Sequence, residues 1–112
     1  FTAVYDRWPD LELGFHMHER TGMAAANMFA ALDAGAKSVE GSICGIGGGI
    51  AMPGGMGDIG NLPTEDIVNM LNRSELATGL DTDLVLATAK KIEAILDIPS
   101  RSYAARNKDI GV

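Results

Sequence analysis

One stretch of the sequence, residues 11–61, limits the folds open to this chain more than any other. In residues 11–18 apolar and polar side chains alternate with a period of two, as expected for a β-strand. An alanine-rich helix is predicted over residues 21–34, with Gly35 as its left-handed cap, and a second strand over residues 38–44. A strand, a helix and a strand joined by short connections form a βαβ unit, in which the strands pair in parallel. The chain is therefore predicted to have an α/β fold.

Two helices are predicted on either side of this stretch. Residues 1–8 have helical spacing that Pro9 stops, and because no capping residue precedes them we expect them to be the tail of a longer helix. Thr64 is predicted to cap a helix that runs to about Asn72. The acidic pair at residues 65–66 would lie in its first turn, where the helix dipole favours negative charge.

A last helix is predicted to begin at Asp81 or Thr82 and to end before Pro99. Residues 100–112 are polar, and we expect them to be loose or docked on a part outside this chain. One stripe of the last helix is predicted to face the core, and it consists of Leu84, Thr88, Ile92, Ile95 and Leu96.

Charge and hydropathy narrow the class of partner. The net charge of −6 argues against a nucleic-acid-binding surface, which needs basic residues to neutralise phosphates. No apolar run approaches the roughly 20 residues of a membrane span, so we expect no membrane partner. The single cysteine, Cys44, fits a reducing compartment such as the cytoplasm. Five of the nine Lys and Arg residues follow position 89, either as solvated side chains or to meet an anionic ligand.

Glycine is concentrated in one loop. Nine of the fourteen glycines lie between residues 41 and 60. A loop this long and this rich in glycine is uncommon unless it is functional, because ordering glycine costs the most backbone entropy. Residues 45–61 are therefore predicted to form a mobile active-site flap. A phosphate-binding loop is disfavoured, since no helix begins directly after the glycine run.

Two histidines share one face of the first predicted strand. His16 and His18 are two residues apart at its C-terminal end, where parallel α/β proteins build their sites. The spacing allows both rings to bind one cation, although core or exposed histidines would give the same pattern. The glycine loop brings in the carboxamide of Asn61. Imidazoles and oxygens with open positions suit Mg²⁺ or Mn²⁺ better than structural zinc.

Four further polar residues each allow two interpretations. Glu19 either orients the histidines or is an exposed acid, and Glu40 either anchors a hydrogen-bond network or acts at the site. Cys44 is either a thiol acid/base or a small buried residue. Asn27, in the middle of the alanine-rich helix, is expected to hydrogen-bond the adjacent loop.

Several motifs taken together resemble the C-terminal part of the metal-dependent lyase and acyl-transfer barrels. This family includes 3-hydroxy-3-methylglutaryl-CoA lyase, isopropylmalate and homocitrate synthases, and 4-hydroxy-2-oxovalerate aldolase. The chain is most similar to the hydroxymethylglutaryl-CoA lyase branch, over about residues 9–97. The motifs are His16-Met17-His18-Glu19-Arg20-Thr21-Gly22, Ala26-Asn27, Gly35-Ala36, Val39-Glu40-Gly41-Ser42, Gly45-Ile46-Gly47-Gly48, Gly60-Asn61-Leu62-Pro63-Thr64-Glu65-Asp66 and Thr78-Gly79-Leu80-Asp81.

The resemblance implies a (β/α)₈ TIM barrel, to which residues 1–112 would contribute roughly strands seven and eight and the helices that follow. A complete barrel needs about 250 residues, so the chain is expected to be a C-terminal fragment. The resemblance also implies that His16, His18 and Asn61 bind a divalent cation, Mg²⁺ or Mn²⁺. The family's fourth protein ligand, an aspartate on the first strand, has no counterpart in this chain. The residues expected to orient the ligands are Glu19 and Glu40.

Two positions depart from the lyase pattern. The loop of the lyase branch carries a catalytic cysteine in a Gly-Gly-Cys-Pro pattern, and after Gly47-Gly48 this chain has Gly49 in its place. The loop is also about three residues longer, and Glu19 stands where an aspartate is usual. Gly47, Gly48 and Gly49 remain the expected substrate-facing part of the loop. These departures favour a divergent lyase.

The function that this resemblance implies is retro-aldol, or Claisen-type, cleavage of a 3-hydroxyacyl-CoA or a related hydroxy acid. His18, or a group outside this chain, would accept the hydroxyl proton while the glycine loop excludes water. We expect a homo-oligomer in the cytoplasm or in the mitochondrial matrix. The alternatives are an acetyl-CoA condensing synthase and a catalytically silent binding or assembly fragment.

Overall fold

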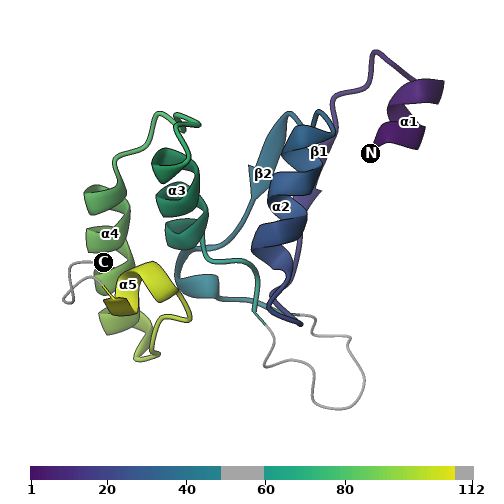
Figure 1. Cartoon of the computed structure of the whole chain (residues 1–112). Coiled ribbons are helices and arrows are strands. Elements are labelled where there is room, and N and C mark those ends of the chain that lie inside the picture. Colours follow the sequence, from purple (N-terminus) through teal and green to yellow (C-terminus); the bar gives the residue numbers. More distant parts are fainter. Residues whose placement is uncertain (49–59, 108–112) are drawn as a thin grey trace.

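The computed structural model describes residues 1–48 and 60–107 of the chain and has principal extents of 46 × 38 × 20 Å (Figure 1). Of the described helices, none has both the length and the apolar character needed to cross a membrane. The elements in chain order are α1 (Thr2–Arg7), β1 (Gly14–His16), α2 (Ala24–Asp33), β2 (Ser38–Glu40), the 3₁₀ turn η1 (Ile43–Gly45), α3 (Thr64–Arg73), α4 (Thr82–Leu96) and α5 (Tyr103–Asn107).

The predicted βαβ unit is present. β1 and β2 pair in parallel, with Phe15 opposite Val39, and α2 connects them. Gly35 ends α2 with a φ of 98°, and two backbone hydrogen bonds close the turn, from Gly35 N to Leu32 O and from Ala36 N to Ala31 O. This is the left-handed glycine cap predicted from the sequence. The α/β class is confirmed.

The boundaries of these elements differ from the prediction. β1 covers only part of residues 11–18, and β2 ends at Glu40, not at Cys44. Beyond β2 the chain bends into η1, where Cys44 adopts a left-handed φ of 58° that no strand tolerates. α2 begins at Ala24, not at residue 21, because Gly22 has a φ of 73°, which is incompatible with an α-helix.

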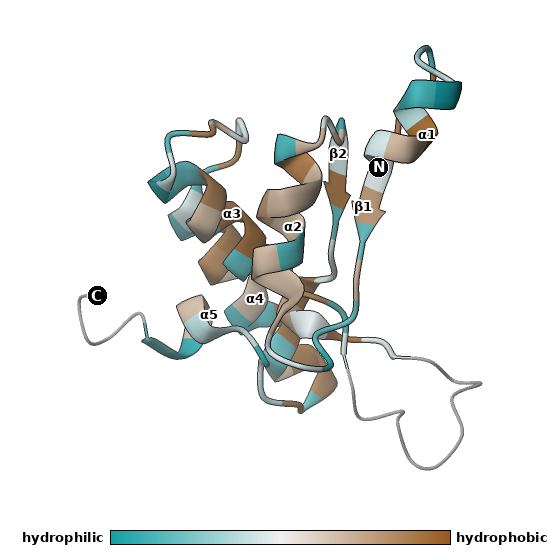
Figure 2. Ribbon diagram, turned by 45° about the vertical axis from the view of Figure 1, so that its right-hand side comes forward, coloured by the Kyte–Doolittle hydropathy of each residue, from teal (hydrophilic) through white to brown (hydrophobic). Residues whose placement is uncertain are grey.

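The core lies between α2 and α3, whose brown, hydrophobic sides are visible in Figure 2. Ala24 and Met28 of α2 are fully buried, and α3 contributes Ile67 and Leu71, with Leu62 just before it. The larger side chain of Met28 fills the space between these elements, next to the small side chain of Ala24.

The start of α3 differs in two ways from the prediction. Pro63 occupies the N-cap position and Thr64 is the first helical residue, with no side-chain capping hydrogen bond. Thr64 N donates instead to Ser42 O at 2.9 Å, so this first-turn amide has a partner without a hydroxyl cap. Glu65 and Asp66 are buried instead of solvated.

The predicted apolar stripe of α4 is wrong, although its predicted cap is confirmed. Asp81 accepts a hydrogen bond from Leu84 N at 2.9 Å. Leu84 and Ile95, however, are 69% and 74% exposed, while Leu86 and Ala89 are buried. α4 packs through the face of Leu86 and Ala89, which contacts η1: the Cys44 thiol donates to Ala89 O at 3.4 Å.

The described part of the C-terminal segment, residues 100–107, is docked on this chain. Ser100 and Ser102 are buried against α3, and α5 follows them. The expectation of a loose tail, or of one docked outside the chain, is therefore wrong for these residues.

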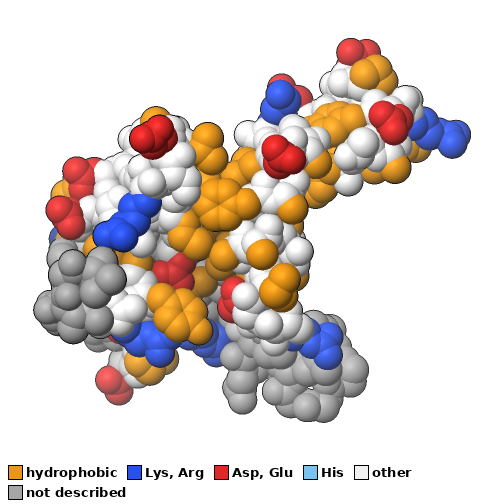
Figure 3. Space-filling view, in the orientation of Figure 1, with side chains coloured by type: hydrophobic (Ala, Val, Ile, Leu, Met, Phe, Trp, Pro, Cys, Tyr) orange, Lys and Arg blue, Asp and Glu red, His pale blue; other side chains and the backbone are white. Residues whose placement is uncertain are grey.

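α1 stands apart from the other helices on an arm of the molecule (Figure 1). Tyr5 ties it down: its hydroxyl donates to Gly35 O at 2.8 Å and accepts from Leu13 N at 3.3 Å. Figure 3 shows hydrophobic side chains gathered over α2 and along this arm. Much of the apolar surface of the arm is thus left uncovered within the described residues.

Candidate functional site

Asn61 lies directly across from His18. The two residues form an isolated antiparallel bridge, flanked by hydrogen bonds from Glu19 N to Gly60 O at 3.0 Å and from Leu62 N to Met17 O at 3.1 Å. In such a pair, which exchanges no hydrogen bond itself, both side chains leave the ladder on the same side. The carboxamide and the imidazole therefore project from the same side of the paired backbones, although 43 positions separate the two residues in the sequence.

The two imidazoles are neighbours at the end of β1. The ring centroids of His16 and His18 are 5.5 Å apart, with an angle of 69° between the ring planes. Glu40 lies opposite His16 in the strand register, and its Oε2 is 3.5 Å from His16 Nδ1. A carboxylate on one ring nitrogen fixes the ring and leaves the other nitrogen free for a ligand.

The carboxamide of Asn61 is fixed in orientation, but only its nitrogen has a hydrogen-bond partner among the described residues. Its Nδ2 donates to Ile46 O at 3.0 Å, a contact that only the amide nitrogen can make. Its Oδ1 is buried and has no hydrogen-bond partner among the described residues. Gly47, with a φ of 89°, makes room for this arrangement, since a Cβ there would lie 2.8 Å from Nδ2. Gly48 is described next to it, whereas Gly49 lies outside the described residues.

The unpaired oxygen tests whether these residues suit a divalent cation. A buried acceptor without a donor is costly, and a cation beside it would remove that cost. Two imidazole nitrogens and one amide oxygen are ligands of the type that Mn²⁺, Mg²⁺ and Zn²⁺ accept. Over residues 1–48 and 60–107, no cluster of three or more His, Cys, Asp or Glu side chains could hold a metal ion. The described donor set thus fits a metal but supplies only part of a coordination sphere.

Cys44 of η1 and Glu65 of α3 are joined by hydrogen bonds. Cys44 N donates to both carboxylate oxygens of Glu65 at 3.0 Å, and Ser100 Oγ donates to Glu65 Oε1 at 3.2 Å. Burial, followed by the nearby charge of Glu65, raises the pKa of the Cys44 thiol above its ordinary value. A buried thiol with a raised pKa is a poor nucleophile and a poor acid/base. The interpretation of Cys44 as a small buried residue is the one that its burial supports.

Sequence reasoning missed the part played by Glu65 and Asp66. Acids in the first turn of a helix are usually solvated, which is why the helix dipole alone was considered. Glu65 lies three residues before the buried Val68, and residues three apart share a helix face. That spacing was the available signal of its burial.

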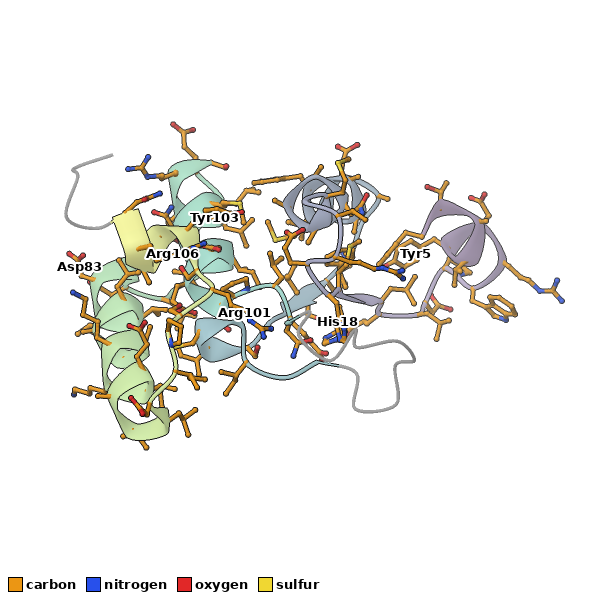
Figure 4. The ribbon with its side chains drawn as sticks, turned by 90° about the horizontal axis from the view of Figure 1, so that it is seen from below. Tyr5, His18, Asp83, Arg101, Tyr103 and Arg106 are labelled. Atoms are coloured by element: carbon orange, nitrogen blue, oxygen red, sulfur yellow. The ribbon has the colours of Figure 1, made fainter. Side chains whose placement is uncertain are left out.

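A pocket of ≈ 670 Å³ adjoins the ladder. Glu19 lines it, and the Oε1 of Glu19 is buried without a hydrogen-bond partner in the described part of the chain. Arg101 lines the same pocket, and Figure 4 shows this residue on the side of the molecule where His18 also lies. Asn27, expected to bond a loop, instead directs Nδ2 to the Met17 sulfur at 3.4 Å.

The comparison with family models identifies the chain. The model of the HMGL-like family matches residues 1–92. The chain belongs to the HMGL-like family. The resemblance seen in the sequence motifs is thereby confirmed.

Known members of the HMGL-like family extend well beyond this chain. Hydroxymethylglutaryl-CoA lyase of Bacillus subtilis is 37% identical over 102 residues, which are 89% of this chain and 33% of that protein. 4-Hydroxy-2-oxovalerate aldolase of Stutzerimonas stutzeri is 37% identical over 94 residues, 83% of this chain and 25% of that protein. The chain therefore spans between a quarter and a third of the length of these two curated relatives.

A solved HMGL-like structure shows the same fold. The HMG-CoA lyase from Acinetobacter baumannii, in complex with coenzyme A and 3-methylmalate, has a TM-score of 0.82 and 29% sequence identity to this chain. The match covers 94% of this chain and 33% of that protein.

Proposed function

We propose that this HMGL-like chain is the C-terminal part of a divalent-metal-dependent carbon–carbon lyase that cleaves a 3-hydroxyacyl-CoA, such as 3-hydroxy-3-methylglutaryl-CoA, to acetyl-CoA and a keto acid. In this proposal residues 1–112 supply about strands seven and eight of a (β/α)₈ barrel, and residues 45–61 form its active-site loop. The observation that carries the proposal is the buried, unpaired Oδ1 of Asn61, placed across from His18 by the antiparallel bridge.

His16, His18 and Asn61 would hold the metal ion. When bound, a divalent ion supplies positive charge that polarises a substrate oxygen and lowers the pKa of the hydroxyl group. Glu40 would keep the His16 ring in position through its contact with Nδ1. Glu19 joins the same ladder through its backbone and would hold the end of the glycine loop against β1.

Residues of this chain would contribute to the reaction in two ways, by accepting a proton from the substrate and by keeping water away from it. His18 is half-buried, so a ring that does not ligate the ion can accept the substrate hydroxyl proton in a partly desolvated site, and a group outside this chain takes that role when His18 binds the metal. Gly47 brings backbone without a side chain next to Asn61, and with Gly48 after it this would let a substrate approach closely. A loop that excludes water protects the carbanionic product from premature protonation.

The test compares His16→Ala and Asn61→Ala with Asp33→Asn, a control on the exposed end of α2, in the longest available form of the protein. Mn²⁺ binding is measured by calorimetric titration, and cleavage is assayed with 3-hydroxy-3-methylglutaryl-CoA and with shorter and longer 3-hydroxyacyl-CoA compounds. Removing a ligand should weaken Mn²⁺ binding by at least about tenfold and abolish cleavage, because metal affinity depends on each ligand and its support. Unchanged Mn²⁺ binding in both variants would refute the proposed site.

A second candidate substrate follows from the relatives. The match to 4-hydroxy-2-oxovalerate aldolase is as high in identity, at 37%, as the match to the B. subtilis lyase. The same ligands would then support retro-aldol cleavage of a 4-hydroxy-2-oxo acid that carries no coenzyme A. Including 4-hydroxy-2-oxovalerate in the assay separates the two: cleavage of this acid, with none of any CoA thioester, would establish the aldolase.

A further inference from the structure

The first turn of α3 binds two distant segments at once. Glu65 accepts hydrogen bonds from Cys44 N, at the start of the glycine loop, and from Ser100 Oγ. Asp66 accepts from Ser102 Oγ at 2.8 Å, from Tyr103 N at 3.1 Å and from Ala104 N at 2.8 Å. The two acids are only 0% and 7% exposed. Burying adjacent carboxylates is costly, so a fold that keeps them depends on the bonds they make.

Between the two bound serines lies Arg101. Its amide donates to Cys44 O at 3.0 Å, which fixes its backbone to the root of the loop. Its side chain runs along glycines: a Cβ added to Gly45 would lie 3.2 Å from Arg101 Cβ, and one added to Gly60 would collide with Arg101 Nη1. The guanidinium group therefore lies against the residue that precedes Asn61.

Arg101 forms no ion pair with a carboxylate in the described part of the chain. Within residues 1–48 and 60–107 no carboxylate oxygen is found within 4.0 Å of the Arg101 guanidinium. Arg101 is exposed and lines the pocket that Asn61 also lines. In a chain of net charge −6, an unneutralised guanidinium at this pocket raises the local concentration of anions.

We propose that Glu65 and Asp66 are positioning residues, which hold the segment from Ser100 to Ala104 so that the Arg101 guanidinium stays beside Gly60 and Asn61. The inference rests on the proposed lyase function, because it assigns Arg101 to the same site and an anionic thioester as the molecule that benefits. Asp66 contributes more to holding this segment than Glu65 does, because all three of its donors belong to the segment. Glu65 also binds Cys44, at the start of the glycine loop.

Limited proteolysis tests the anchoring without any activity. Trypsin cleaves after arginine, and the variant Asp66→Asn should speed cleavage after Arg101 and Arg106 by about tenfold, since cleavage reports local opening. Cleavage after Arg73, at the end of α3, serves as the internal control and should not change. Ser102→Ala, which removes a single donor and keeps the charge, covers the case in which Asp66→Asn fails to fold. Equal acceleration at Arg73, or no acceleration at Arg101 and Arg106, overturns the inference.

A double-mutant cycle tests whether Asp66 acts through Arg101. Arg101→Ala and Asp66→Asn should each raise KM for the CoA thioester about tenfold, and the double variant should match Arg101→Ala within about twofold, because residues acting as one unit are not additive. A purely structural role for Asp66 would lower activity equally in both backgrounds, and that result contradicts the inference.

The control variant Asp33→Asn should change neither the rate of tryptic cleavage nor the KM for the CoA thioester. Loss of Mn²⁺ binding in His16→Ala is scored separately. If that loss is absent while the proteolysis result holds, the proposed function fails and the anchoring stands. If the loss is present while the cycle is additive, the anchoring of Arg101 fails and the proposed function stands.

Discussion

A carboxylate with no exposed surface, that of Glu65, joins the loop root to the C-terminal segment. Its burial opposes ionisation and raises the pKa of Glu65 above the ordinary value of 4.5, while the bonds from the Glu65 and Cys44 amides and from Ser100 act in the opposite direction. Burial is the largest of these effects, so the ionised form is held at a cost.

The pKa of Glu65 predicts how stability depends on pH. Because the folded pKa lies above the unfolded one, this group contributes stability that is fully present below pH 4.5 and is lost as pH rises through the folded pKa. The loss amounts to about 1.4 kcal/mol for each unit by which the pKa is raised. The Glu65→Gln variant cannot ionise and should lack this loss.

The measurement is denaturant unfolding of both proteins from pH 4 to pH 8. The unfolding free energy of the native protein minus that of Glu65→Gln should fall as pH rises through this window and then level off. A difference that grows with pH would mean that hydrogen bonding, not burial, controls this carboxylate.

At the level of elements, the strands and helices whose residues follow a regular polar and apolar pattern could be predicted from the sequence. Features that depend on tertiary contacts could not. The alternation before His16 and the glycine at position 35 were enough to predict β1, α2 and their parallel partner. The alternation of polar and apolar residues continues to His18, but β1 ends at His16 because β2 ends at Glu40, opposite it. His18 pairs with Asn61 instead. Which face of α4 is buried depends on the approach of η1, which no local pattern encodes.

The candidate site shows the same division. The positions of His16, His18 and Asn61 were found from their spacing and from the resemblance, whereas Glu65, Asp66 and Arg101 were not. The hydrogen bonds that the Glu65 and Asp66 side chains accept join residues 21 or more positions apart. Apart from the spacing of Glu65 and Val68 on one helix face, no local pattern distinguishes a buried first-turn acid from a solvated one.

The exposure of α4 leads to a contrast between two leucines on one helix. Leu86 is 6% exposed and Leu84 is 69% exposed. Leu86→Ala should lower the free energy of unfolding by about 2–5 kcal/mol, because it leaves a cavity. Leu84→Ala should change it by less than about 0.5 kcal/mol, as exposed substitutions do. Denaturant titration of both variants checks this, and equal costs would mean that another surface covers Leu84 in solution.

At the scale of the whole molecule, the chain covers only a fraction of the length of its relatives and leaves apolar surface on α4 and the arm of α1 uncovered. Its two-stranded sheet is short, with three residues in each strand. The main stabilising contacts join α2, α3, α4 and the C-terminal segment. A ligand that bridges β1 and the glycine loop would therefore add a connection that the core does not supply.

Adding and removing the metal ion should change the thermal stability of the protein if the ion bridges β1 and the glycine loop. Mn²⁺ at about one hundred times its dissociation constant should stabilise the protein by about 2.7 kcal/mol, which raises the Tm by several degrees. Chelation with EDTA should reverse the rise. His16→Ala should show neither the rise nor the reversal in a thermal unfolding scan, and an equal rise in this variant would place the ion elsewhere.

Because of the antiparallel bridge between His18 and Asn61, the length of the glycine segment can change without moving the histidines and Asn61 relative to one another. Its flanking hydrogen bonds fasten the far end of the glycine segment to the strand end, and the cost of closing a loop grows only with the logarithm of its length. Insertions among residues 49–59 would then leave both imidazoles and the carboxamide in register. Under the proposed function, substrate preference can then change through insertions in this segment while the proposed metal ligands keep their arrangement.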